Sequence, residues 1–139
     1  MLGGFNPLRW DCNKRGCFNI KRRPKIEVFS DCFPGKISFG DVDGIVEING
    51  FGLMLGWKTE TTEPTKGQRI MYEKLTRTGL MTVLLVIGNA ETMEVSHLGT
   101  FVRGKQSKLE NSDLTGAKGK IKQWVKWALS HKKQPRAGL

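Results

Sequence analysis

Polar and apolar residues alternate most regularly between positions 41 and 58, where Asn49-Gly50 separates two short runs. Asn-Gly between alternating apolar residues is the strongest short-range signal for a two-residue hairpin turn. With the turn at these two residues, Ile48 faces Phe51, and one face of the hairpin becomes almost wholly apolar. The residues on that face are Val42, Val46, Ile48, Phe51, Leu53, Leu55 and Trp57. Because the separation of the two faces is clean, it supports this register.

The opposite face of the same hairpin gathers charged residues at one end. In the predicted register Asp43 lies opposite Gly56, and Asp41 lies opposite Lys58. Facing residues on paired strands have Cβ atoms about 5 Å apart. The sequence therefore predicts that two aspartates and one lysine converge on one face.

Further elements follow from other patterns. Ile26, Phe29 and Phe33 space like one face of a short helix after Pro24, and a strand is predicted to start over 37–41. Thr65 and Gln68 have the spacing of a capping box and predict a helix that ends at Gly79. Strands are predicted over 80–87 and 94–103, and a basic helix over 114–133. The apolar stripe predicted for that last helix is Ile121, Trp124, Val125, Ala128 and Leu129.

These elements predict one α/β domain over residues 1–139, with a mixed central sheet built on a β-hairpin core and flanked by helices. Residues 1–23 form a basic arm in this interpretation, residues 24–103 the core, and residues 114–133 the C-terminal helix. The longest apolar run, 80–87, is far shorter than a bilayer span, and no signal segment opens the chain. A cytoplasmic location is expected, with no membrane partner. The three cysteines are expected to be buried, reduced thiols rather than zinc ligands.

The charge of +10 is unevenly distributed, because both ends of the chain are basic and the middle is acidic. Such segregation favours binding to a polyanion, most often nucleic acid, over a merely soluble basic surface. Trp127 falls off the apolar stripe, and either stacking on a base or covering a neighbouring surface would explain it. The candidate nucleic-acid-binding residues are Lys21, Arg22, Arg23, Lys66, Arg69, Lys118, Lys120, Lys122 and Lys126.

The hairpin and the helix after it resemble the PD-(D/E)XK nuclease superfamily, nearest to its virus-type replication-repair nuclease and junction-resolvase-like branches. In that motif an aspartate begins one hairpin strand, and a (Glu/Asp)-x-Lys triplet lies on the partner strand. Asp43 matches the aspartate, Gly56-Trp57-Lys58 matches the triplet, and Gln68 matches a glutamine found after the triplet in several branches. The resemblance covers about residues 24–90 and implies a restriction-endonuclease-like fold.

The resemblance also implies roles for these residues. Asp43 and the backbone carbonyl of Trp57 would hold Mg2+ or Mn2+, and Glu27 resembles a helix-borne acid that some branches add. Lys58 would orient the attacking water or stabilise charge on the phosphate, with Gln68 beside it. Each has a plainer alternative: a turn cap for Asp43, a salt bridge to Asp41 for Lys58, a solvated side chain for Glu27, and a helix cap for Gln68.

Position 56 departs from the motif, because glycine stands where the second acid is expected. Two carboxylates chelate a divalent ion, whereas one holds it weakly. One hypothesis is that glutamate was replaced there in a parent nuclease, and the other is a natural inactive descendant.

The predicted function is therefore metal-dependent endonucleolytic hydrolysis of DNA, chosen by structure, in a phage or repair context, in an inactivated form. The cell would be bacterial or phage-infected. The alternative is a non-catalytic nucleic-acid-binding protein of the same fold. Many such nucleases act as homodimers, although this sequence shows no dimer face.

Overall fold

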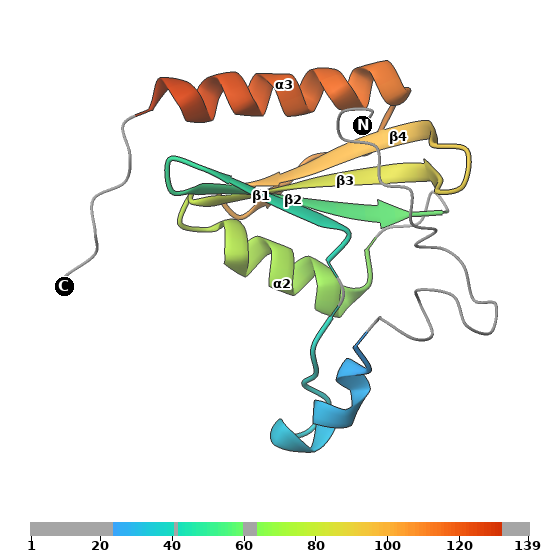
Figure 1. Cartoon of the computed structure of the whole chain (residues 1–139), viewed down its shortest axis with the longest axis vertical. Coiled ribbons are helices and arrows are strands. Elements are labelled where there is room, and N and C mark those ends of the chain that lie inside the picture. Colours follow the sequence, from blue (N-terminus) through green and yellow to red (C-terminus); the bar gives the residue numbers. More distant parts are fainter. Residues whose placement is uncertain (1–23, 41, 60–63, 132–139) are drawn as a thin grey trace. The chain divides into compact units, whose positions relative to one another are not determined.

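The computed structural model describes residues 24–40, 42–59 and 64–131 (Figure 1). The chain divides into two compact units, Met1–Asp41 and Val42–Leu139. The predicted arm over 1–23 and the residues Lys21, Arg22 and Arg23 lie outside the described residues. The single domain expected over the whole chain stays a prediction.

The described part of the first unit is built around a short 3-10 helix, η1 (Ile26–Cys32). Phe39 folds back onto the helix region, with ring centroids 6.0 Å from Phe29 and 5.2 Å from Phe33. No residue of η1 is buried, so the expectation of a buried thiol is wrong for Cys32, which is exposed. The strand predicted to start over 37–41 is also wrong for residues 37–40, which carry no strand.

The second unit is a six-stranded mixed sheet between two helices, α2 (Lys66–Thr76) on one face and α3 (Leu114–Ser130) on the other (Figure 1). The strand order is β1-β2-β3-β4-β5, with β6 also paired to β4, and among the described strands only β2 and β3 run parallel. This confirms the predicted mixed α/β sheet with a hairpin at its start. The strands are β1 (Gly44–Ile48), β2 (Phe51–Lys58), β3 (Met81–Asn89), β4 (Glu94–Val102), β5 (Lys105–Gln106) and β6 (Glu110–Asn111).

The β1–β2 hairpin has the predicted register, with Ile48 opposite Phe51 and Gly44 opposite Leu55. Asn49 (φ 54°) and Gly50 (φ 88°) both have positive φ, as a type I′ turn requires. The Asn49 side chain also donates to the carbonyl oxygens of Ala128 and His131, each at 3.1 Å. The turn residue therefore ties the hairpin to the end of α3.

The crossover from β2 to β3 passes through α2, whose N-terminus forms the predicted capping box between Thr65 and Gln68. A parallel pair needs such a crossover, because its strands enter the sheet from the same edge. Thr76, fully buried near the end of α2, accepts a hydrogen bond from the backbone N–H of Gly104. The turn between β4 and β5 is thereby fixed against α2.

The apolar stripe predicted for the last helix is only partly correct. Ala117, Trp124 and Ala128 are buried against the sheet, together with Phe51, Leu53, Leu84 and Val86 of the strands. Leu129 is 63% exposed and Ile121 37% exposed. The buried face of α3 is rotated toward Trp127, because the hairpin places Phe51 beneath that side of the helix.

Candidate functional site

Asp43 lies directly before β1 and binds the backbone of the partner strand. Its Oδ2 accepts a hydrogen bond of 2.7 Å from the backbone N–H of Trp57. In an antiparallel ladder both backbone groups of a hydrogen-bonded residue point to the same neighbour. The carbonyl of Trp57 therefore points to the side of β2 on which Asp43 lies. The Trp57 indole is on the other face of the sheet, where its Nε1–H donates to the carbonyl of Gly88 at 3.0 Å.

Gly56 is buried, and the hydroxyl group of Tyr72 lies over it. A Cβ built on Gly56 would lie 3.1 Å from the Tyr72 hydroxyl oxygen and 3.4 Å from Cδ1 of Leu85. Tyr72 is itself only 8% exposed, and its ring packs against Phe101 with centroids 5.1 Å apart. The position at which the nuclease motif expects an acid is thus closely covered by a phenol from α2.

The electrostatic surroundings of Tyr72 connect it to Asp43. Burial, and after it the negative charge of Asp43, raise the pKa of the Tyr72 phenol above its ordinary value of 10.0. Both effects disfavour the charged phenolate form of Tyr72. Gly56 and Tyr72 meet on the α2 face of the sheet, and the hairpin register, extended by one pair, puts Asp43 on that face too.

Sequence analysis did not identify Tyr72 as a site residue. The available signal was its spacing, since Tyr72 follows Gln68 by four positions and residues so spaced lie on one face of a helix. The covering of Gly56 depends on how α2 packs on the sheet, which no local pattern reveals.

Lys58 ends β2, two residues after Gly56, so the alternation of the strand places it on the same face. Asp41, its predicted partner across the hairpin, lies outside the described residues. The Gln68 side-chain oxygen accepts from the backbone N–H of Thr65 at 3.2 Å and so caps α2. Glu27 belongs to the first unit. Catalytic and metal-binding roles for these residues stay predictions.

The oxygen ligands present would meet the smallest number of carboxylates with which a hydrated magnesium ion is bound. Magnesium prefers oxygen ligands and keeps several waters, so one or two carboxylates suffice. Asp43 supplies one carboxylate, and the Trp57 carbonyl points to the same side. No cluster of three or more His, Cys, Asp or Glu able to hold a metal is found in the described part of the chain. The glycine at position 56 leaves this donor set one acid below that of the motif.

The basic candidates are divided between the two faces of the sheet. Lys66 and Arg69 lie at the start of α2, where Arg69 also pairs with Glu73 at 3.8 Å. Three exposed lysines, spaced by four, follow the outer side of α3: Lys118, Lys122 and Lys126. Lys120 lies on another side of α3, where it lines a cavity. The basic side chains of α2 and those of α3 therefore do not form one continuous surface.

Trp127 covers a neighbouring surface of its own unit. Its ring centroid lies 4.6 Å from that of Phe51 and 4.4 Å from that of His131. The packing alternative that the sequence left open is therefore the arrangement found in the structure.

Comparison of the chain with protein-family models, with curated proteins and with solved structures finds no match. The described helices include none with the length and apolar character needed to cross a membrane.

Proposed function

We propose that the chain is a PD-(D/E)XK-type, restriction-endonuclease-like protein that binds DNA and lacks one acid needed for efficient phosphodiester hydrolysis. The observation that carries the proposal is the position of Asp43. Its carboxylate is hydrogen-bonded at the edge of β2, on the same sheet face as Gly56 and Lys58. This is the arrangement expected from the motif, with glycine at the acidic position.

The order of elements around this position also supports the proposal. A hairpin is followed by a helix with a capping box and by a strand parallel to the second hairpin strand. In the motif, the aspartate and the triplet lie on the hairpin and the glutamine lies on the helix that follows. Asp43, Gly56-Trp57-Lys58 and Gln68 occupy those elements in that order.

In this proposal Asp43 and the Trp57 carbonyl would hold Mg2+ or Mn2+. When bound, such an ion polarises a phosphate and lowers the pKa of a coordinated water. Lys58 stabilises negative charge that develops on the phosphate. Asp43 positions the site, because its bond to Trp57 fixes one carboxylate oxygen. A second carboxylate at position 56 would complete the chelate.

A second candidate is a non-catalytic nucleic-acid-binding protein of the same fold. The observation that favours it is the Tyr72 hydroxyl over Gly56, because a Cβ there would lie 3.1 Å from that oxygen. Glycine and tyrosine then form a matched pair rather than a damaged site. Binding by this protein would depend on its basic side chains and not on a metal ion.

Restoring the acid tests the two candidates. Gly56→Glu is made alone and together with Tyr72→Phe, which removes the hydroxyl that crowds a Cβ at position 56. We expect Mg2+- or Mn2+-dependent cleavage of branched or double-stranded DNA in the double variant, and less in Gly56→Glu alone. Adding Asp43→Asn to the double variant should abolish this activity.

The wild-type chain and Tyr72→Phe are the matched controls and should cleave little or no DNA. If the folded double variant binds DNA but does not cut it with either ion, the nuclease proposal is wrong and the binding protein remains. Retained cleavage after Asp43→Asn would also exclude the assigned site.

A further inference from the structure

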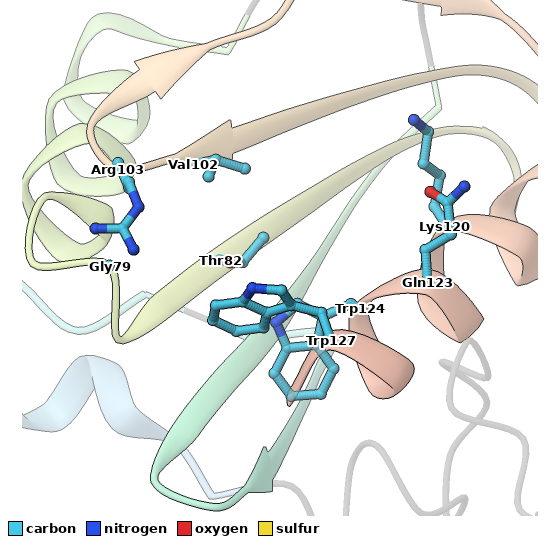
Figure 2. Close-up of a pocket in the computed structure, with 8 residues that line it drawn as sticks. All are labelled: Gly79, Thr82, Val102, Arg103, Lys120, Gln123, Trp124 and Trp127. Carbon is cyan, nitrogen blue, oxygen red and sulfur yellow. The ribbon is translucent and has the colours of Figure 1, made fainter. Parts of the chain in front are cut away.

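A cavity of about 320 Å³ opens between α3 and the sheet, on the face opposite to Asp43 and Gly56. Thr82 and Val102 line its sheet side, and Trp124 and Trp127 line its helix side (Figure 2). Thr82 follows the alternation of β3 onto the α3 face, because its neighbour Val83 packs with Tyr72 on the α2 face. The cavity therefore lies outside the proposed nuclease site.

Trp124 lines the helix side of this cavity and is only 8% exposed. Its indole N–H has no hydrogen-bond partner among the described residues. Protein atoms cover that nitrogen, so the surface that Trp124 presents to the cavity is apolar ring carbon.

Two cations stand at different ends of the cavity. Arg103 lies near Gly79 at one end, and Lys120 extends at the other (Figure 2). The guanidinium occupies the space beside Gly79, where a Cβ would lie 2.7 Å from Nη1 of Arg103. Gly79 thus allows the guanidinium to approach the cavity closely.

The backbone of Arg103 is itself unusual. Arg103 has φ 50° and Gly104 has φ 81° in the two-residue turn between β4 and β5. Asn is the common non-glycine residue at such a position, and arginine is not. The turn is held against α2 by the bond from Gly104 to Thr76, so the start of the Arg103 side chain is well fixed.

The combination of groups selects a class of ligand. Arg103 and Lys120 attract an anion, and guanidinium groups suit phosphate oxygens. The parts of the indole rings that line the cavity offer apolar contact to a base. Gln123 and Thr82 add polar groups at the wall. The volume is at the lower end of the range for small-molecule sites.

We propose that this cavity binds one nucleotide unit with a terminal phosphate, its phosphate near Arg103 or Lys120 and its base against the tryptophans. The unit is either a free nucleoside monophosphate or the phosphorylated end of a DNA strand, which share this chemistry. The site does not depend on the proposed nuclease function.

Calorimetric titration of the full chain with deoxyadenosine monophosphate tests the proposal. Arg103→Asn removes the guanidinium and keeps a residue that tolerates positive φ, and Lys120→Ala removes the ammonium. We expect at least one of the two to weaken binding about tenfold, as loss of a charge-assisted hydrogen bond does. Lys74→Ala is the matched control, since Lys74 is an exposed lysine of α2, on the other face of the sheet, and does not line the cavity. It should leave the affinity unchanged.

A second readout uses Trp124, which lines the cavity. The indole N–H signal of Trp124 in a ¹H–¹⁵N spectrum, assigned from its loss in Trp124→Phe, should move when the monophosphate binds. No movement at saturation, or wild-type affinity in both Arg103→Asn and Lys120→Ala, would overturn the proposal. Equal affinity for inorganic phosphate and for the monophosphate would exclude a nucleotide.

A single-stranded tetranucleotide, tested with and without a 5′-phosphate, distinguishes a free nucleotide from the phosphorylated end of a DNA strand. If only the phosphorylated form moves the Trp124 signal, the site takes a strand end. If the free monophosphate moves it and neither tetranucleotide does, the site takes a free nucleotide. If none of these ligands moves it, the cavity is not a nucleotide site, whatever the outcome at Asp43.

Discussion

The backbone N–H of Trp57 donates to Oδ2 of Asp43 at 2.7 Å, so a side chain replaces the next link of the β1–β2 ladder. The bond joins the residue that begins the hairpin to the last part of β2. It also holds the carboxylate on the side to which the Trp57 carbonyl points. Asp43 therefore has a structural role at the site, whether or not it binds an ion.

Removing this carboxylate should destabilise the hairpin. We expect Asp43→Ala to lower the free energy of unfolding by about 1 kcal/mol, since the bond is charge-assisted but exposed. Asp43→Asn keeps an acceptor oxygen and should lose less. Urea denaturation checks both, with Glu91→Ala as an exposed acidic control. A smaller loss for Asp43→Ala than for Asp43→Asn would contradict the role of the bond.

A side chain at position 56 should compete with the Tyr72 hydroxyl. We expect Gly56→Ala to destabilise the protein by about 1 kcal/mol, because a close contact in a packed site requires neighbours to shift. In a Tyr72→Phe background the same change should have a smaller effect, since the nearest contact is gone. A double-mutant cycle by chemical denaturation measures this coupling. Additive effects would show that the hydroxyl does not crowd position 56.

Tyr72 is the chain's single tyrosine, so phenolate absorbance near 295 nm would report on it alone. Its pKa is raised, first by burial and then by the charge of Asp43. Its midpoint should therefore lie above 10.0 in the folded protein. Asp43→Asn should lower the midpoint but leave it raised, because burial remains. An unchanged midpoint in Asp43→Asn would mean that the carboxylate does not act on the phenol.

The ionisation of Tyr72 also makes the free energy of unfolding depend on pH. A proton bound more tightly in the folded state contributes stability fully below the unfolded pKa of about 10. That contribution is lost as the pH rises through the folded pKa. We expect the free energy of unfolding to fall above about pH 10 less steeply in Tyr72→Phe than in the wild type.

Asn49 has two separable roles, in the turn and in the tether to α3. Asn49→Gly keeps positive φ easily and removes only the bonds to Ala128 and His131. We expect it to cost about 1 kcal/mol, and Asn49→Ala about 2 kcal/mol, because alanine also disfavours this φ. Guanidinium denaturation measures both. Equal losses would mean that the left-handed conformation contributes nothing.

DNA bound at the proposed nuclease site should contact α2 rather than the outer side of α3. The pair Lys66→Ala and Arg69→Ala should flatten the slope of log affinity against log salt by about 1.8, if both contact phosphates. The equally charged pair Lys122→Ala and Lys126→Ala should change it little. Fluorescence anisotropy at several salt concentrations compares them. The reverse result would place DNA on the α3 face.

Much of the local structure is determined by short stretches of sequence. Asn49-Gly50 sets the turn and, with the alternation around it, the whole register of β1 and β2. Thr65 and Gln68 set the start of α2. These predictions succeeded because turn conformation and helix capping involve residues only a few positions apart. The same register placed Asp43 and Gly56 on one face.

Only the tertiary structure decided what covers those faces. Tyr72 reaches Gly56 of β2 from a helix that packs mainly on β3 and β4, and Trp127 is covered because Phe51 lies beneath α3. The tryptophans and the two cations that line the cavity come from α3 and from a turn far away in the chain. Contacts of this kind depend on how helices pack on a sheet, which residue spacing does not encode. The pattern of the chain thus specified the hairpin, its turn and the cap of α2, and the packing of the helices on the sheet decided which side chains cover them.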